Sequence, residues 1–220
     1  MNRKVIITGA TGMVGEGVLH ECLQHPNITE VLLINRRPSG VSHSKVKEVI
    51  LPDFFKISDV KIDFRDYNAC FFCLGVSSVG MSKEDYYRFT YELTMGVARA
   101  LVAQNPNMTF CYVSGAGTDS SEKGRLNWAR VKGKTENDLL KLPFKKAYMF
   151  RPGFLQPTPG LKNTLKMYNY LGWLVPVLRL FFSNSMSTLR ELGLAMINVV
   201  ERGYEKPIIE VKDIKVLAKG

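Results

Sequence analysis

The chain contains few of the residues from which metal sites and disulfide frameworks are built: four cysteines and three histidines in 220 residues. Cys70 and Cys73 have C-x-x-C spacing, but they fall in an apolar run expected to form a strand, where positions three apart face opposite sides. No second cysteine or histidine pair completes a zinc site. We therefore expect Cys22, Cys70, Cys73 and Cys111 to be buried thiols without metal or disulfide, which fits a reducing cytoplasm.

Long apolar runs are also missing. No stretch reaches the roughly eighteen consecutive apolar residues that indicate a transmembrane helix. The first apolar run reads as a core strand, so we expect no cleavable signal peptide. The sequence has no helix-turn-helix, RNA-binding signature or zinc module, and specific nucleic-acid binding is therefore not expected. The histidines His20, His25 and His43 have no partners in a recognisable arrangement and receive no role.

Acidic residues are outnumbered by basic ones, 20 to 30, which gives a net charge of +10. A basic surface keeps a protein soluble, and it also attracts anionic partners such as a phosphorylated cofactor, an acidic membrane surface or nucleic acid. The length fits one domain over residues 1–220 with a sizeable core.

Strand and helix signals alternate along the chain. This alternation predicts an α/β fold of the Rossmann type, a doubly wound parallel sheet with flanking helices. The expected strands are 5–8, 31–35, 46–51, 69–74, 108–114, 147–151 and 207–211. The expected helices are 13–24, 83–104, 126–141 and one from Thr188, whose S/T-x-x-E spacing is that of a capping box, to Gly203.

The first expected strand runs directly into glycines spaced G-x-x-G-x-x-G. In such a turn the glycines allow a tight reversal, a close approach to a pyrophosphate and close packing of helix on strand. The unpaired N–H groups and positive end of the following helix favour phosphate binding. The candidate phosphate-binding residues are Gly9, Thr11, Gly12, Met13, Val14 and Gly15.

The second strand ends in a pair of arginines, Arg36 and Arg37, where many NAD-binding folds carry an acidic residue against the ribose. Guanidinium groups bind a 2′-phosphate that a carboxylate would repel. We therefore favour NADP over NAD. The alternative is that both arginines are solvated loop charges.

Two further positions are candidates for the adenosine half of a cofactor. Asp53 follows Pro52, where its carboxylate either accepts the adenine amino group or serves a turn. Leu74 and Gly75 end the fourth strand, and the glycine permits a close approach.

The glycine turn, Ser114-Gly115, Lys132 and Arg151-Pro152-Gly153 together resemble the short-chain dehydrogenase/reductase superfamily. Within it, the chain is similar to an atypical branch that includes Tat-interacting-protein-like oxidoreductases, NmrA-like regulators and nucleoside-diphosphate-sugar epimerase-like proteins. The resemblance implies that Pro152, Gly153 and Phe154 pack near the nicotinamide.

The catalytic unit of that superfamily is a serine with Tyr-x-x-x-Lys. The resemblance implies that Ser114 orients the reacting oxygen and that Lys132 holds the nicotinamide ribose. Position 128, where tyrosine is expected, is tryptophan, and indole offers no usable proton near neutral pH. Substitute donors to be weighed are Tyr86, Tyr87 and Tyr91, whose aromatic rings equally suit packing.

Residues 155–220 are expected to form a small substrate or lid portion. Within it, 161–182 is aromatic and basic, and suits a lid, core packing, an amphipathic patch on acidic lipid or a homo-oligomer interface; we favour the lid or packing over the membrane.

The sequence therefore predicts an NADP(H)-binding carbonyl/alcohol oxidoreductase that acts on a small molecule with an altered proton donor. The alternatives are a catalytically weak cofactor-binding regulator that signals to a protein partner, and a nucleotide-sugar epimerase-like enzyme. The chain after 151 is short for the substrate domain of such epimerases.

Overall fold

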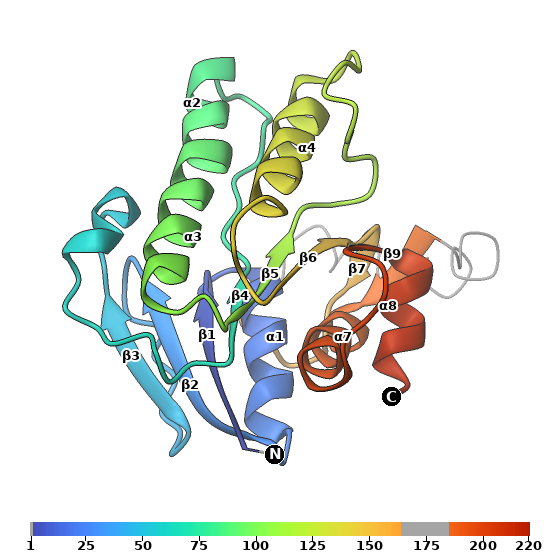
Figure 1. The fold of residues 1–220 in the computed structure, drawn as a ribbon. Coiled ribbons are helices and arrows are strands. Elements are labelled where there is room, and N and C mark those ends of the chain that lie inside the picture. Colours follow the sequence, from blue (N-terminus) through green and yellow to red (C-terminus); the bar gives the residue numbers. More distant parts are fainter. Residues whose placement is uncertain (1, 164–184) are drawn as a thin grey trace.

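The computed structural model describes residues 2–163 and 185–220. Its centre is a parallel seven-stranded sheet in the order β3-β2-β1-β4-β5-β6-β9, which is the doubly wound arrangement expected from the sequence (Figure 1). The strands of this sheet are β1 (Arg3–Thr8), β2 (Ile28–Asn35), β3 (Val46–Ile50), β4 (Ala69–Phe72), β5 (Thr109–Val113), β6 (Lys146–Arg151) and β9 (Ile208–Glu210). The order in which successive strands are added reverses between the parallel neighbours β1 and β4, so the crevice used for ligands in this fold lies beyond their carboxyl ends.

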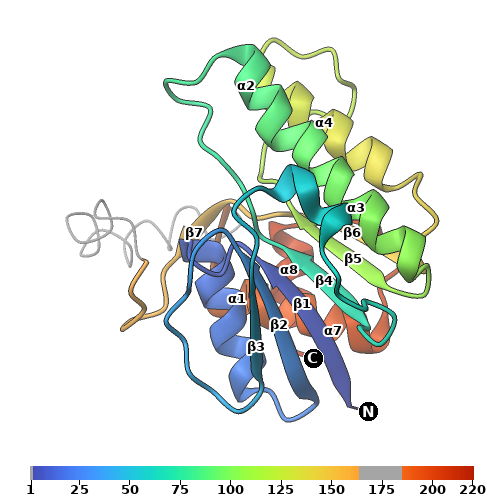
Figure 2. The same ribbon diagram turned by 90° about the vertical axis from the view of Figure 1, so that its left-hand side faces the viewer.

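Helices cover both faces of the sheet, and this explains why the inner strands are apolar without interruption. Val5 and Ile7 of β1 join the core beneath one set of helices, while Ile6 joins the core beneath the other. Figure 2 shows α1, α7 and α8 on one face and α3 with α4 on the opposite face. The helices are α1 (Met13–Gln24), α2 (Lys83–Tyr87), α3 (Leu93–Gln104), α4 (Asn127–Leu139), α7 (Leu189–Arg202) and α8 (Val211–Ala218).

The helix expected over 83–104 forms, but its hydrogen-bonding pattern changes along its length. Between α2 and α3 the chain makes a π turn, η2 (Arg88–Glu92). A short 3₁₀ segment, η1 (Phe54–Asp59), follows β3 and packs against α3. The π turn matters for the site because it carries Arg88 and Phe89 toward η1.

The part of the chain after β6 contains elements that the sequence did not predict. Strands β7 (Phe154–Gln156) and β8 (Met186–Thr188) pair in parallel outside the main sheet. The predicted start of α7 is confirmed, since Thr188 Oγ1 accepts from Glu191 N at 2.9 Å and Glu191 Oε2 accepts from Thr188 N at 2.7 Å. Most of the aromatic stretch 161–182 lies outside the described residues.

All four cysteines carry free thiols, and Cys22, Cys70 and Cys111 are buried. Burial raises the pKa of the half-buried Cys73 thiol to about 12.

Within the described ranges, no group of three or more His, Cys, Asp or Glu side chains could hold a metal ion. No helix there is both long enough and apolar enough to cross a membrane.

Candidate functional site

The glycine turn brings the start of α1 against the end of β1. Gly9 has φ +76°, and a Cβ there would lie 2.9 Å from the Cys73 carbonyl group. A Cβ on Gly15 would lie 2.2 Å from Gly9 O, so α1 could not approach β1 this closely with any other residue. Gly12 caps α1 without a side-chain hydrogen bond, and Met13 opens the helix. The first N–H groups of α1 therefore have no side-chain cap.

A groove of about 490 Å³ opens in front of this turn. The pair Arg36 and Arg37 line it just beyond β2, and both side chains are exposed. Neither guanidinium has a hydrogen bond or ion pair with another residue in the part of the chain that the structure describes. The remaining lining residues are Gly9, Thr11, Gly12, Cys73, Leu74 and Gly75. The lining contains no carboxylate, so its electrostatics favour an anionic ligand.

A smaller hollow of about 120 Å³ adjoins the groove. Its walls are largely apolar and include Phe55 from η1 and Phe89 from η2, with ring centroids 6.1 Å apart. Arg88 lies over the Phe55 ring at 5.0 Å. Because Arg36, Leu74 and Gly75 line both hollows, the two form one continuous depression.

Asp53 lies in the wall of the smaller hollow and also caps η1. Its Oδ1 accepts from Phe55 N at 3.0 Å. Asp53 therefore has the turn role that the sequence offered as one of two alternatives. Its carboxylate also borders the smaller hollow. The aromatic residues Phe55 and Phe89 were not singled out from the sequence, because an isolated phenylalanine at a helix end gives no signal of a pocket.

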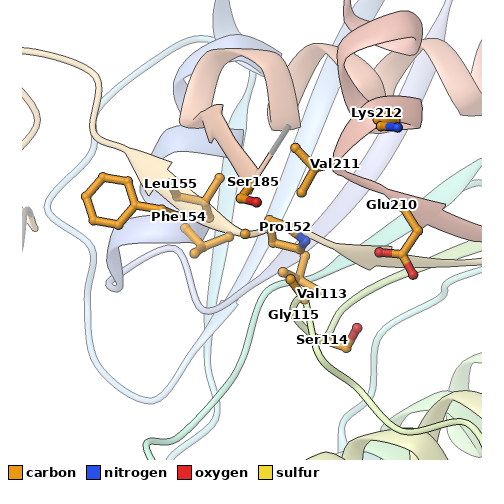
Figure 3. A pocket seen from close by; sticks show the side chains of 13 residues that line it. Val113, Ser114, Gly115, Pro152, Phe154, Leu155, Ser185, Glu210, Val211 and Lys212 are labelled. Atoms are coloured by element: carbon orange, nitrogen blue, oxygen red, sulfur yellow. The ribbon is translucent and has the colours of Figure 1, made fainter. Parts of the chain in front are cut away.

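A third cavity, of about 790 Å³, lies where β5, β6 and β9 end (Figure 3). Its lining brings together residues far apart in sequence, from Val14 in α1 to Lys212 in α8. A Cβ on Gly153 would lie 2.1 Å from Ser185 O, so the turn after β6 packs tightly against the segment before β8. The other lining residues are Val113, Ser114, Gly115, Ala116, Pro152, Phe154, Leu155, Glu210 and Val211.

The Ser114 hydroxyl belongs to a buried polar network behind this cavity. Its Oγ lies 2.5 Å from Glu136 Oε1 and 3.1 Å from the Phe150 carbonyl oxygen, and both of these are acceptors. Glu136 is fully buried and also accepts from Arg151, whose Nη1 reaches Glu210 at 3.2 Å. The one hydroxyl proton of Ser114 is therefore used inside the protein. Glu136 carries no motif that identifies it from the sequence, although it lies four residues after Lys132 on the same helix.

Lys132 and Trp128 are half-buried residues of α4. The Lys132 ammonium donates to the Ser114 carbonyl oxygen. Burial lowers the pKa of Lys132, and the nearby Glu136 carboxylate opposes that change. The Trp128 ring packs against Gly117, where a Cβ would lie 3.3 Å from it.

The three tyrosines weighed as substitute proton donors do not line any of the three hollows. Tyr86 is buried, and the Tyr87 ring packs against the Tyr91 ring with centroids 4.8 Å apart and planes tilted by 31°. The Tyr91 hydroxyl donates to Asp138 Oδ2 at 2.8 Å. Their placement in the structure is that of packing residues between α2, η2 and α4.

A doubly wound sheet, a glycine turn and a groove at the carboxyl edge define a Rossmann-type protein. The chain belongs to the NAD dependent epimerase/dehydratase family, whose model matches residues 5–125. Members of this group bind a nicotinamide cofactor, and NAD appears in the titles of several structural neighbours.

Similar proteins agree with this membership. The chain is 27% identical over 157 residues to "Protein FMP52, mitochondrial" of Meyerozyma guilliermondii, which is 69% of this chain and 65% of that relative. It is 27% identical over 190 residues to "Protein HTATIP2" of Rattus norvegicus, covering 80% and 77% of the two chains. The fold also matches the Bordetella bronchiseptica enzyme WbmF in complex with NAD+, with a TM-score of 0.68, 11% identity and coverage of 99% and 77%.

Proposed function

We propose that the protein binds NADP(H) along the continuous depression at the carboxyl edge of its sheet. The observation that carries this proposal is the position of Arg36. This residue borders both the groove in front of the glycine turn and the smaller hollow lined by Phe55 and Phe89, which we call the aromatic hollow. In NADP the 2′-phosphate is carried by the ribose that links the pyrophosphate to the adenine. A guanidinium at the junction of the two hollows is therefore suited to bind it.

The residues present fit such a cofactor along its length. Cβ positions at Gly12 and Gly75 face open space, the first with only Gly9 O at 3.5 Å and the second with nothing within 4 Å. The uncapped N–H groups at the start of α1 would bind the pyrophosphate. Phe55 and Phe89 would flank the adenine, with Asp53 available to accept from its amino group.

The nicotinamide half would extend into the larger cavity, where Pro152, Gly153 and Phe154 form one wall and Lys132 would hold the ribose. When bound, the nicotinamide supplies or accepts a hydride. The reaction we propose is interconversion of a carbonyl and an alcohol on a small molecule bound in this cavity. Ser114 Oγ can accept a hydrogen bond from an alcohol, while its own proton remains with Glu136.

Calorimetric titration with NADPH and NADH tests the cofactor assignment. We expect NADPH to bind more tightly than NADH. The double substitution Arg36→Ala/Arg37→Ala should lower the affinity for NADPH at least about tenfold, which corresponds to about 1.4 kcal/mol of binding free energy. Arg99→Ala is the matched control, because Arg99 is an exposed arginine of α3 that borders none of the three hollows. Equal binding of NADH, or an unchanged NADPH affinity in the double variant, contradicts the assignment.

A second candidate function is that of a cofactor-binding regulator that signals nicotinamide redox state to a protein partner. Two observations favour it: position 128 carries no transferable proton, and the Ser114 hydroxyl is bound within the protein. The variant Trp128→Tyr separates the two functions. A steep rise in NADPH oxidation with a panel of carbonyl compounds favours a regulator that has lost its catalytic tyrosine. Ordinary turnover by the native chain rules the regulator out.

A further inference from the structure

Few side chains at the large cavity could give a proton to a substrate. Among the described residues that line it, only Ser114, Ser185, Glu210 and Lys212 carry titratable or hydroxyl groups. Ser114 is bound to Glu136, and Glu210 accepts from Arg151. A serine hydroxyl such as that of Ser185 is no more acidic than the alcohol product, and Lys212 lies on the α8 side, across the cavity from Ser114 (Figure 3).

Lys132 is not among the residues that line the cavity, but it lies directly behind one of them, Gly115. Gly115 has φ +146°, a conformation that favours glycine, and it forms part of the cavity wall. A Cβ on Gly115 would lie 3.8 Å from Lys132 Nζ. Because Gly115 has no side chain, it leaves the ammonium uncovered on that side. One N–H of the ammonium is used by the Ser114 carbonyl oxygen, and two remain.

The charged groups around Lys132 come from α4, β6 and β9. Glu136 is on the same helix, and its carboxylate is already shared between Arg151 and the Ser114 hydroxyl. Glu210 at the end of β9 pairs with the outer side of Arg151. Lys132 is thus a half-buried ammonium that forms no ion pair with a carboxylate among the described residues, a setting in which a lysine gives up its proton more readily.

We propose that Lys132 itself transfers the proton of the redox reaction, taking the role that the tyrosine has in the superfamily. The inference rests on the proposed NADP(H)-dependent reaction. In the reductive direction the carbonyl carbon gains a hydride from the reduced nicotinamide, which is oxidised. The carbonyl oxygen takes the proton from Lys132 Nζ, so that an N–H bond breaks and an O–H bond forms. The neutral amine then regains a proton from water.

The first test measures protonation without turnover. Protein labelled with ¹³C at the lysine Cε atoms is titrated by NMR, and the Lys132 signal is assigned by its loss in Lys132→Arg. Lys134, two positions away, is the internal control because its ion pair with Asp138 raises its pKa to about 12. We expect Lys132 to titrate well below Lys134 and below an ordinary lysine. A midpoint at or above that of Lys134 overturns the proposal.

The second test joins binding to pH-dependent kinetics. Lys132→Arg keeps the charge but cannot release a proton near neutral pH. Because the arginine can still donate a hydrogen bond to the nicotinamide ribose, we expect Lys132→Arg to bind NADPH within a few-fold of the native affinity and to lose about 10²-fold or more in kcat. Lys134→Arg should lose neither. In the native chain, the rate of carbonyl reduction should fall as pH rises through the midpoint found by NMR.

The measurements distinguish a failure of the proposed NADP(H)-dependent function from a failure of the role proposed for Lys132. Absence of NADPH binding removes the proposed function. NADPH binding with no turnover of any carbonyl, or turnover that survives Lys132→Arg, overturns only the role given to Lys132. Loss of activity in Lys212→Ala with a native rate in Lys132→Arg would transfer the role to Lys212.

Discussion

The carboxylate of Glu136 in α4 and the guanidinium of Arg151 at the end of β6 form a buried ion pair. Arg151 Nε lies 3.1 Å from both carboxylate oxygens of Glu136. Arg151 also donates to Ser120 Oγ at 2.5 Å and reaches Glu210 at 3.2 Å. One pair of side chains thus ties α4, the loop after β5, β6 and β9 together behind the cavity.

Removing the negative charge of this pair should destabilise the folded protein. In Glu136→Gln the Arg151 guanidinium remains buried without its main counter-charge, so we expect the free energy of unfolding to fall by about 3 kcal/mol or more. Unfolding in urea measures this change in the free energy of unfolding. The matched control is Asp63→Asn, which breaks the fully exposed pair with Arg65 and should leave the midpoint unchanged. An equal, small effect in both variants would show that the buried network does not stabilise the site.

Two of the three glycines of the turn, Gly12 and Gly15, should respond differently to a single added methyl group. Gly15→Ala places a Cβ 2.2 Å from Gly9 O, so we expect a loss of about 1–3 kcal/mol in unfolding free energy. Gly12→Ala meets only an ordinary contact at 3.5 Å. It should fold with a near-native Tm and yet bind NADPH at least about tenfold more weakly, because its methyl group enters the groove. Native NADPH affinity in Gly12→Ala would show that phosphates do not lie there.

The aromatic hollow should contribute to binding only where a ligand carries adenine. Phe89→Ala removes one of the three phenylalanine rings that line it, and base–aromatic stacking is worth about 1–3 kcal/mol per base. We expect affinity for 2′,5′-ADP and NADPH to fall in parallel, while binding of nicotinamide mononucleotide stays unchanged. Val79→Ala, an exposed apolar position that does not line the hollow, serves as the control. A uniform loss for all three ligands would indicate general disruption.

Asp138 should make stability depend on pH in the acid range. Burial alone would raise the pKa of its carboxyl, but hydrogen bonds from Lys134, Lys141 and Tyr91 outweigh this and hold the pKa well below its usual range. A depressed folded-state pKa contributes stability above the unfolded value of about 3.9 and loses it as pH falls further. Asp138→Asn should therefore be less stable than the native chain at pH 7. The difference in unfolding free energy between the two proteins, measured by urea unfolding, should shrink as pH drops below about 4. A difference that stays constant with pH contradicts this account.

Much of the fold could be predicted because its signals are local. Apolar runs between turns located all six strands from β1 to β6, with ends that differ by up to three residues, and α1 was predicted with its observed ends, Met13 and Gln24. The short strands β7 and β8 could not be found, because each has three residues and its partner lies some thirty positions away. The strand expected over 207–211 ends at Glu210, and α8 begins at Val211, where Glu210 and Asp213 form a capping box.

The candidate site was predictable where the backbone defines it and less so where side chains do. The glycine spacing located the groove in front of α1, since only glycine fits at Gly9 and Gly15. The direction of the Ser114 hydroxyl depends on Glu136, a contact across 22 positions that no local pattern encodes. The pairing of Phe55 with Phe89 likewise depends on how η1 meets the π turn.

The most direct test of the central claim is a crystal structure of the protein grown with NADPH. We predict density for the dinucleotide along the groove, with the pyrophosphate at the start of α1 and the 2′-phosphate within hydrogen-bonding distance of Arg36 or Arg37. A groove without density at saturating NADPH, or a dinucleotide whose adenosine end lies away from Arg36, would contradict it.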